Sequence, residues 1–173
     1  DVLKHWEGFK SVELMASVDG TGRRGELIRA GMDWDTMQEN ARRLKKEKPP
    51  VGTFRFMVTA TLSAMNVFHL PEIQRGWMDE GLLGADDLFI NPLVTPEPYS
   101  AQILPAREKE QVAAIYRQFI RSHLSHSPAA RKRYESALNY IGEADKSHLL
   151  PSFVQAMNKL DQIRSENFVD VFP

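Results

Sequence analysis

The apolar residues in the first part of the chain follow two different periods. Ser11 to Val18 and Thr53 to Leu62 are rich in β-branched and apolar residues, which is typical of buried strands. Between them, the apolar residues of Trp34 to Lys46 recur at helical spacing, and Asp33 is a suitable N-cap for that helix. The helix is predicted to stop before the Pro49–Pro50 pair, because proline cannot continue a helix.

The next segment repeats the alternation of helix and strand. Pro71 to Gly81 is predicted to form a short helix, and Asp87 to Val94 (DLFINPLV) a third strand. Pro92 has no amide to donate, so it indicates a bulge or an early end of that strand. Short strands that alternate with helices favour parallel pairing with right-handed crossovers. The carboxyl ends of the three strands are therefore expected to lie together at one edge of a sheet.

Later in the chain the pattern becomes helical. Arg107 to His123, Ala129 to Gly142 and Leu149 to Arg164 each carry apolar residues at helical spacing. The predicted fold class is therefore α/β, with about three parallel strands in residues 1–105 and a mostly helical segment in residues 106–173.

Composition narrows the classes of function. The net charge of −1, from 22 basic and 23 acidic residues, gives no long-range attraction to nucleic acid or to an anionic membrane. No apolar run approaches the roughly 20 residues that span a bilayer, and no secretory signal pattern is present, so a cytoplasmic location is expected. The chain contains no cysteine, so it offers no thiolate nucleophile and no thiolate ligand for zinc or an iron–sulfur cluster.

Polar side chains follow the first predicted strand at the point where it ends. Ser17, Asp19 and Gly20 make a polar turn that can offer hydroxyl, carboxylate and amide groups to a ribose or a carboxylate. Arg29 follows in the short predicted helix GELIRAG, which ends at Gly31, and its planar guanidinium suits a carboxylate or a phosphate. A simple turn and an ordinary arginine on a helix face remain open alternatives.

The second strand end carries similar groups. Thr61, Ser63 and Asn66 supply hydroxyls and an amide suited to ligands with hydroxyl or amino-acid groups, although S-x-x-N is a pattern of low specificity. His123 and His126 have no carboxylate partner nearby, which favours solvated histidines over a metal site. No catalytic residue and no metal ligand is predicted.

Together these segments resemble the radical S-adenosylmethionine superfamily, in particular its twitch-type proteins related to the SPASM group. The matching segments are VELMASVDGTGRRGELIRAG followed by MDW and EN, VTATLSAMNVFHLPE, FINPLV-x-PEPYSAQILP, and LLPSFVQAMNKLDQIRSENFVDVFP. The resemblance implies the C-terminal half of a partial (β/α)6 TIM-like barrel, whose open edge holds S-adenosylmethionine against a [4Fe–4S] cluster. Its reductive cleavage gives a 5′-deoxyadenosyl radical that abstracts hydrogen from a substrate, for which a peptide or protein is one candidate.

The resemblance also implies which positions contact the cofactor. In such families the S-x-D-G end of the fourth strand and the next arginine contact ribose, amino or carboxylate groups. The S-x-x-N after the fifth strand reaches ribose or carboxylate, and the sixth strand lines the adenine. The expected S-adenosylmethionine contacts are Ser17, Asp19, Arg29, Ser63, Asn66 and Leu93, with Asn91 also near the adenine.

The chain departs from the family because it has no C-x-x-x-C-x-x-C loop and no second cysteine set for an auxiliary cluster. The resemblance therefore implies that a missing N-terminal half supplies the cluster loop, and that this half or another chain covers the strand edge near Ser11 to Val18. The chain alone is expected to be inactive, and either unstable or paired with a partner. Two alternatives stay open: a cluster-free α/β binding or interaction module, and an unrelated α/β domain with an anion-binding turn at Asp19 to Arg24.

Overall fold

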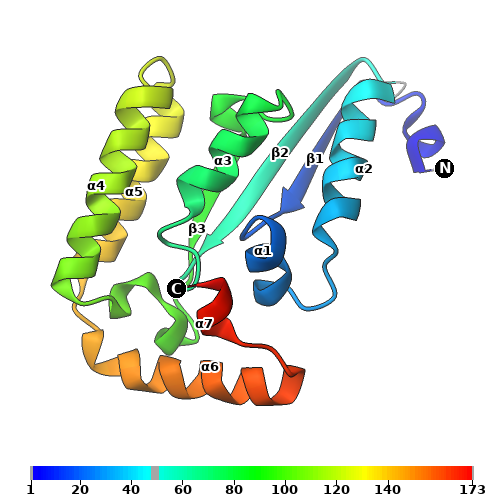
Figure 1. Ribbon diagram of the computed structural model, residues 1–173. Coiled ribbons are helices and arrows are strands. Elements are labelled where there is room, and N and C mark those ends of the chain that lie inside the picture. Colours follow the sequence, from blue (N-terminus) through cyan, green and yellow to red (C-terminus); the bar gives the residue numbers. More distant parts are fainter. Residues whose placement is uncertain (1, 48–50, 173) are drawn as a thin grey trace.

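The computed structural model describes residues 2–47 and 51–172. Its centre is an open sheet of three parallel strands in the order β1–β2–β3 (Figure 1). The strands are β1 (Ser11–Ser17), β2 (Thr53–Leu62) and β3 (Leu88–Pro92). All three predicted strands are confirmed, and β3 ends at Pro92, before the predicted end at Val94. Pro92 has no amide to donate to a neighbouring strand.

Helices connect the strands, as right-handed parallel crossovers require. They are α1 (Gly22–Ile28) and α2 (Trp34–Glu47) between β1 and β2, and α3 (Leu70–Asp79) between β2 and β3. The carboxylate of Asp33 accepts a hydrogen bond from the amide of Thr36 at 2.7 Å, which confirms Asp33 as the N-cap of α2. The predicted stop at Pro49–Pro50 lies outside the described residues.

The chain after β3 is helical. Its α-helices are α4 (Ala106–His123), α5 (Pro128–Glu143), α6 (Leu150–Arg164) and α7 (Phe168–Val171). The first three match the predicted helices to within one residue at each end. Sequence periodicity misses α7, because one helical turn is too short to show a period. Short 3-10 helices cover Val2–Trp6, Ala85–Asp87, Glu97–Tyr99, Ala101–Ile103 and Ser147–Leu149.

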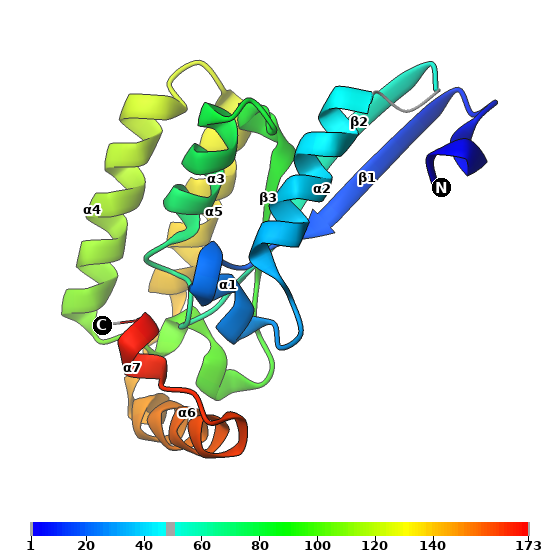
Figure 2. The same ribbon diagram turned by 45° about the vertical axis from the view of Figure 1, so that its right-hand side comes forward.

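Helices cover one face of the sheet and leave the other face open. Val58, Leu62 and Leu88 point into the core with the helices, as alternation along a strand predicts. The intervening positions face the other side, which is exposed at Met15 of β1 (49%) but buried at Met57 of β2 (3%). Figure 2 shows α2 in front of β1 and β2, on the covered side.

One hydrophobic core joins the sheet to the helices that follow it. The buried Trp77 of α3 stacks on Phe56 of β2, with ring centroids 5.7 Å apart. Tyr116 of α4 and Tyr134 of α5 are fully buried in the same core and meet edge to face, with centroids 5.0 Å apart. The core thus contains residues from both sides of position 105, and the predicted division into 1–105 and 106–173 stays a prediction.

A second, smaller core lies at the end of the sheet toward which the strands point. Phe153 and Met157 of α6 are buried against Ile103, and Ala64 and Met65 from the loop after β2 pack against them. α7 lies beside α1 in both ribbon views (Figures 1 and 2). The C-terminal helices therefore lie next to the loops that carry the predicted site.

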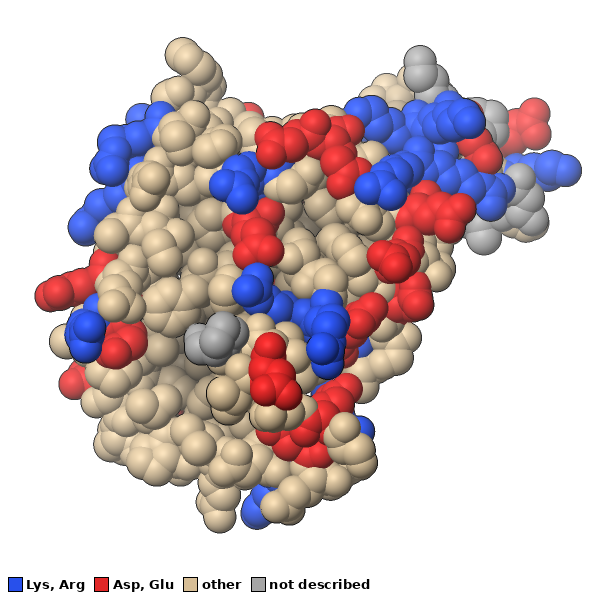
Figure 3. Space-filling model, in the orientation of Figure 1, with Lys and Arg blue, Asp and Glu red and all other residues tan. Residues whose placement is uncertain are grey.

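Charged side chains of both signs are interspersed over the face that carries α1, α2 and α3 (Figure 3). Basic groups gather at the C-terminal end of α2, where Lys45 and Lys46 occupy the last turn, which suits the helix dipole. Acidic groups lie close beside them, in keeping with the net charge of −1. In the part of the chain that the structure describes, no helix combines the length and the apolar character that crossing a membrane requires.

Candidate functional site at the carboxyl edge of the sheet

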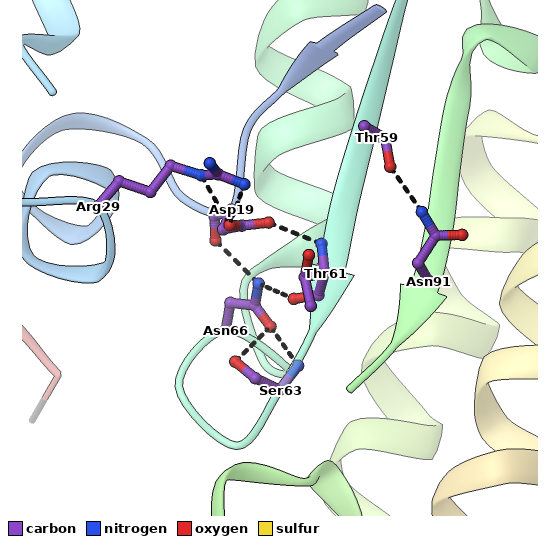
Figure 4. Close-up of polar contacts among 7 residues, drawn as sticks. All are labelled: Asp19, Arg29, Thr59, Thr61, Ser63, Asn66 and Asn91. Atoms are coloured by element: carbon purple, nitrogen blue, oxygen red, sulfur yellow. Dashed lines mark hydrogen bonds and ion pairs between the residues drawn. The ribbon is translucent and has the colours of Figure 1, made fainter. Parts of the chain in front are cut away.

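The carboxyl ends of the three strands meet, as the parallel topology predicts. Ser17 of β1 lies opposite Thr59 of β2, and Thr61 of β2 lies opposite Asn91 of β3. Asn91 donates a hydrogen bond from Nδ2 to Oγ1 of Thr59 at 2.7 Å, which links the two strands on the open face (Figure 4). The predicted site residues are therefore brought to one edge from three separate parts of the chain.

Asp19 is a buried carboxylate with a full set of partners. Its side chain is 7% exposed, and Oδ1 accepts a hydrogen bond from the amide of Thr61 at 2.6 Å. Oδ2 lies 2.8 Å from both Nε and Nη2 of Arg29. Charge-assisted hydrogen bonds of this kind offset the desolvation of a buried carboxylate. Asp19 thereby fixes the end of β1 to β2 and orients the guanidinium of Arg29 (Figure 4).

Asn66 joins the loops that follow β1 and β2. It is 1% exposed, and its Nδ2 donates to the carbonyl oxygens of Asp19 at 3.0 Å and Thr61 at 2.8 Å. Its Oδ1 accepts hydrogen bonds from the amide and the hydroxyl of Ser63 at 2.9 Å and 3.3 Å. Both donors and both acceptor positions of the amide are therefore occupied. Asn66 holds the edge together rather than presenting a free group.

The glycines after β1 allow α1 to pack against the turn that carries Asp19. A Cβ atom added to Gly25 would lie 2.5 Å from the carbonyl oxygen of Gly20, well inside van der Waals contact. A side chain at either position would push α1 away from the turn. The G-x-x-x-x-G spacing of this segment thus reflects a close backbone approach.

Ser17 and Arg29 are among the groups at the edge that keep free polar capacity. Ser17 is exposed at the end of β1, and its hydroxyl has no hydrogen-bond partner among the described residues. The side chain of Arg29 is 38% exposed, although Asp19 holds one side of its guanidinium. Arg29 and Ser17 can therefore bind an added carboxylate or hydroxyl group.

Leu93 contributes to the edge differently from the polar residues. Its amide donates to the carbonyl of Leu62 at 2.8 Å, and its carbonyl accepts a hydrogen bond from the hydroxyl of Tyr140 at 2.8 Å. Both backbone groups are therefore occupied, and the half-buried side chain is what remains for an apolar ligand surface. The predicted contacts of Leu93, Ser63, Asn66 and Asp19 with a cofactor stay predictions.

A neighbouring cluster was not foreseen from the sequence. Glu72 of α3 accepts a hydrogen bond from the hydroxyl of Thr21 at 3.1 Å and pairs with Nη1 of Arg24 at 2.8 Å. His69 lies 3.4 Å from the same carboxylate. Burial lowers the pKa of His69 below its ordinary value of 6.5, and Arg24 lowers it further, although Glu72 acts in the opposite direction. His69 and Glu72 are local neighbours at the start of α3, but no local pattern links them to Thr21 and Arg24, which come from a distant part of the chain.

The described residues offer no recognised metal centre, and a cavity near β2 lies away from the edge. No group of three or more His, Asp or Glu side chains is gathered for a metal ion within residues 2–47 and 51–172. A cavity of about 470 Å³ lies near the amino end of β2, lined by Phe54, Phe56 and Leu82 with Lys45 at its side. It is separate from the carboxyl edge, where the strand ends bring the polar residues together.

Comparison with protein-family models, curated proteins and solved structures finds no match to this chain.

Proposed function

We propose that this chain forms part of the cofactor-binding edge of a radical S-adenosylmethionine enzyme, as the C-terminal half of a partial (β/α)6 barrel. The observation that carries the proposal is the convergence of Arg29, Asp19 and Asn66 at the carboxyl edge of a parallel sheet. Ligands of parallel α/β folds bind at this edge. The segments that converge there are the ones that resemble the superfamily.

The contacts of the edge residues suggest two different roles. Arg29 and Ser17 keep free capacity, so we assign them to the carboxylate and to a hydroxyl or amino group of S-adenosylmethionine. Asp19, Ser63 and Asn66 are occupied by one another and by the backbone, so they position the edge. S-adenosylmethionine held at this edge would supply a 5′-deoxyadenosyl radical for hydrogen abstraction from the substrate, with an electron delivered by a cluster that other residues would have to ligate.

The [4Fe–4S] cluster does not fit this chain, because the chain has no cysteine to ligate iron. The proposal therefore requires that a further polypeptide segment carries the cluster and that its strands extend the sheet. The outer edge of β1 supports such an extension. Because the amide of Val18 points to Thr59 of β2, strand alternation directs the amides of Ser17, Met15 and Glu13 outward.

The test is anaerobic reconstitution of the product of the complete reading frame with iron and sulfide. We expect a coloured protein that binds S-adenosylmethionine and releases 5′-deoxyadenosine when a reductant is added. Arg29→Gln should weaken S-adenosylmethionine binding about tenfold or more, because it removes a charged partner of the carboxylate. Arg42→Gln is the matched control, since Arg42 pairs with Glu80 on the surface, away from the edge. A reading frame without C-x-x-x-C-x-x-C would overturn the proposal.

A second candidate is a cluster-free α/β module that binds a carboxylate ligand at the same edge. The lack of cysteine favours it, and Arg29 would play the same part. This candidate predicts a colourless protein after reconstitution that still loses ligand binding in Arg29→Gln. Colour and 5′-deoxyadenosine release therefore distinguish the two candidates.

A further inference from the structure

We propose that the C-terminal segment, residues 164–172, acts with Glu72 as a strap that positions α1 and, through α1, the pair of Arg29 and Asp19. Glu72 is a positioning residue in this proposal, since it reaches Arg29 only through α1. The effect on cofactor binding rests on the proposed function, whereas the strap itself does not.

α1 needs support from outside the helix. It spans Gly22–Ile28, far fewer than the roughly 12 residues that make an isolated helix even marginally stable. Gly22 and Gly25 weaken it further, because glycine is among the poorest helix formers. The position of α1 is therefore set by its tertiary contacts.

Glu72 supplies two of those contacts from α3. Its Oε1 accepts from the hydroxyl of Thr21, which precedes α1, and its Oε2 lies 2.8 Å from Nη1 of Arg24 in the first turn. Both bonds are partly buried, so water screens them less than an exposed ion pair. Glu72 thus ties the start of α1 to a helix that is anchored in the main core.

The C-terminal segment supplies two more contacts. Arg164 donates from Nη1 to the carbonyl of Leu27 at 2.8 Å, and Arg24 donates from Nε to the carbonyl of Val171 at 3.4 Å. The first bond caps an otherwise free carbonyl near the end of α1. Figures 1 and 2 both show α7 lying against α1. The strap therefore holds α1 near both of its ends.

Aromatic rings keep the strap in place. The ring of Phe168 lies 5.9 Å from Phe153 of α6 and 4.9 Å from Phe172. The ring of Phe172 in turn lies 5.8 Å from His69, beside Glu72. This run of rings connects the strap to the same corner of α3 that carries the carboxylate. The contacts of Glu72 and of the strap are consequently made by one continuous cluster.

α1 transmits this support to the carboxyl edge. The amide of Arg29 donates to the carbonyl of Gly25 at 2.9 Å, so Arg29 directly follows α1 as its C-cap residue. Its guanidinium donates a hydrogen bond to the carboxylate of Asp19, which also accepts a hydrogen bond from the amide of Thr61. A shift of α1 must therefore displace the guanidinium that we assign to the cofactor carboxylate.

The experiment measures hydrogen–deuterium exchange of α1 in the 173-residue chain. Glu72→Gln is compared with Glu80→Gln, a matched control that also lies next to α3 and binds one arginine and one neutral side chain, Arg42 and Gln38. Phe172→Ala is compared with Val169→Ala, whose side chain is 65% exposed. We expect about tenfold faster exchange at the Arg29 amide in Glu72→Gln and Phe172→Ala, and less than about a twofold change in both controls.

S-adenosylmethionine binding by the reconstituted product of the complete reading frame is the second readout. We expect Glu72→Gln to weaken binding about fivefold while Glu80→Gln leaves it unchanged. Unchanged exchange in α1 of both Glu72→Gln and Phe172→Ala would overturn the strap. If the wild-type protein binds no S-adenosylmethionine, the proposed function fails, and the exchange data still decide whether the strap exists.

Discussion

The two outer edges of the sheet are treated differently by the rest of the chain. At the β3 edge, Arg133 of α5 donates from Nη1 to the carbonyls of Asp86 at 2.8 Å and Leu88 at 3.1 Å, and its guanidinium lies 4.2 Å from the ring centre of Phe89. Tyr140 lies about two turns further along α5 on the same face of the helix. Its hydroxyl donates to the carbonyl of Leu93, just beyond the end of β3. On the outer side of β1, away from β2, no described residue makes a comparable bond to Ser11–Ser17.

This difference indicates the side on which the sheet can grow. α5 lies beside β3, and its Arg133 and Tyr140 side chains donate hydrogen bonds to backbone carbonyls at that edge of the sheet. β1 has a single charged side chain, Glu13, and no proline or lysine within Ser11–Ser17, so it lacks the usual devices that block edge pairing. The closed β3 edge and the open β1 edge are what the C-terminal half of a larger parallel sheet would require, which supports the proposed function.

The largest expected effect comes from detaching α5 from the β3 side. Tyr134 of α5 is fully buried against Tyr116 and Phe119, so Tyr134→Ala leaves a large cavity. We expect the free energy of unfolding to fall by about 3–5 kcal/mol, measured by urea denaturation. Glu135→Ala, on the exposed side of the same helix, should change it by less than about 0.5 kcal/mol.

Tyr134→Phe sharpens this prediction. The hydroxyl of Tyr134 is buried and has no hydrogen-bond partner among the described residues. Removing it should leave stability unchanged or raise it slightly, because an unpaired buried hydroxyl is unfavourable. A loss of more than about 1 kcal/mol in Tyr134→Phe would contradict the packing described for α5.

Alkaline pH is expected to have the next largest effect, by lowering the free energy of unfolding through two buried tyrosines. Burial raises the pKa of Tyr116 and of Tyr134 above the ordinary value of 10.0, because the phenolate cannot be solvated in the core. Below about pH 10 both tyrosines are neutral in the folded and in the unfolded chain, so their titration does not lower the free energy of unfolding. Above it the unfolded chain loses protons first, so stability falls by about 1.4 kcal/mol per pH unit for each group. Urea denaturation near pH 9 and pH 11 checks this, and Tyr116→Phe with Tyr134→Phe should flatten the slope.

The sequence predicts much of this architecture because the relevant signals are local. The β-branched and apolar residues of Ser11–Ser17 and Thr53–Leu62 predict strands, and the alternation of strands with helices then implies parallel pairing. That order brings Asp19, Asn66 and Asn91 to one edge without any further information. The location of the candidate site could therefore be predicted from the sequence, although the hydrogen bonds within it could not.

The remaining contacts depend on how distant elements pack. Glu72 and Arg24 are separated by 48 residues, and Tyr140 and Leu93 by 47, so no local period relates them. The sequence also does not reveal that the side chain of Asn66 is satisfied by its neighbours, because that requires the positions of two loops. Roles in positioning α1 and in covering β3 thus emerge only from the folded chain.

A smaller effect is expected from one hydrogen-bonded group at the covered edge. The hydroxyl of Tyr140 donates to the carbonyl of Leu93 and also lies 2.9 Å from Oγ of Ser100. Tyr140→Phe leaves the carbonyl and the buried Ser100 short of a partner, and we expect a loss of about 1 kcal/mol in thermal or urea denaturation. Asn139→Ala, at the exposed neighbouring position, is the control. Equal stability of the two variants would show that α5 covers β3 by packing alone.

The smallest effect on stability, and the most direct test of the open edge, is expected from Met15→Lys. Met15 is 49% exposed on β1, and a lysine there should change the free energy of unfolding by less than about 0.5 kcal/mol. The wild-type chain is expected to self-associate through β1, and the added charge should shift it toward monomer in sedimentation or light scattering, because lysine on an edge strand opposes pairing. Val154→Lys, on α6 with 48% exposure, carries the same charge and should leave association unchanged. If the wild-type chain is a stable monomer, or if Val154→Lys acts as strongly as Met15→Lys, the open β1 edge is not the surface that associates.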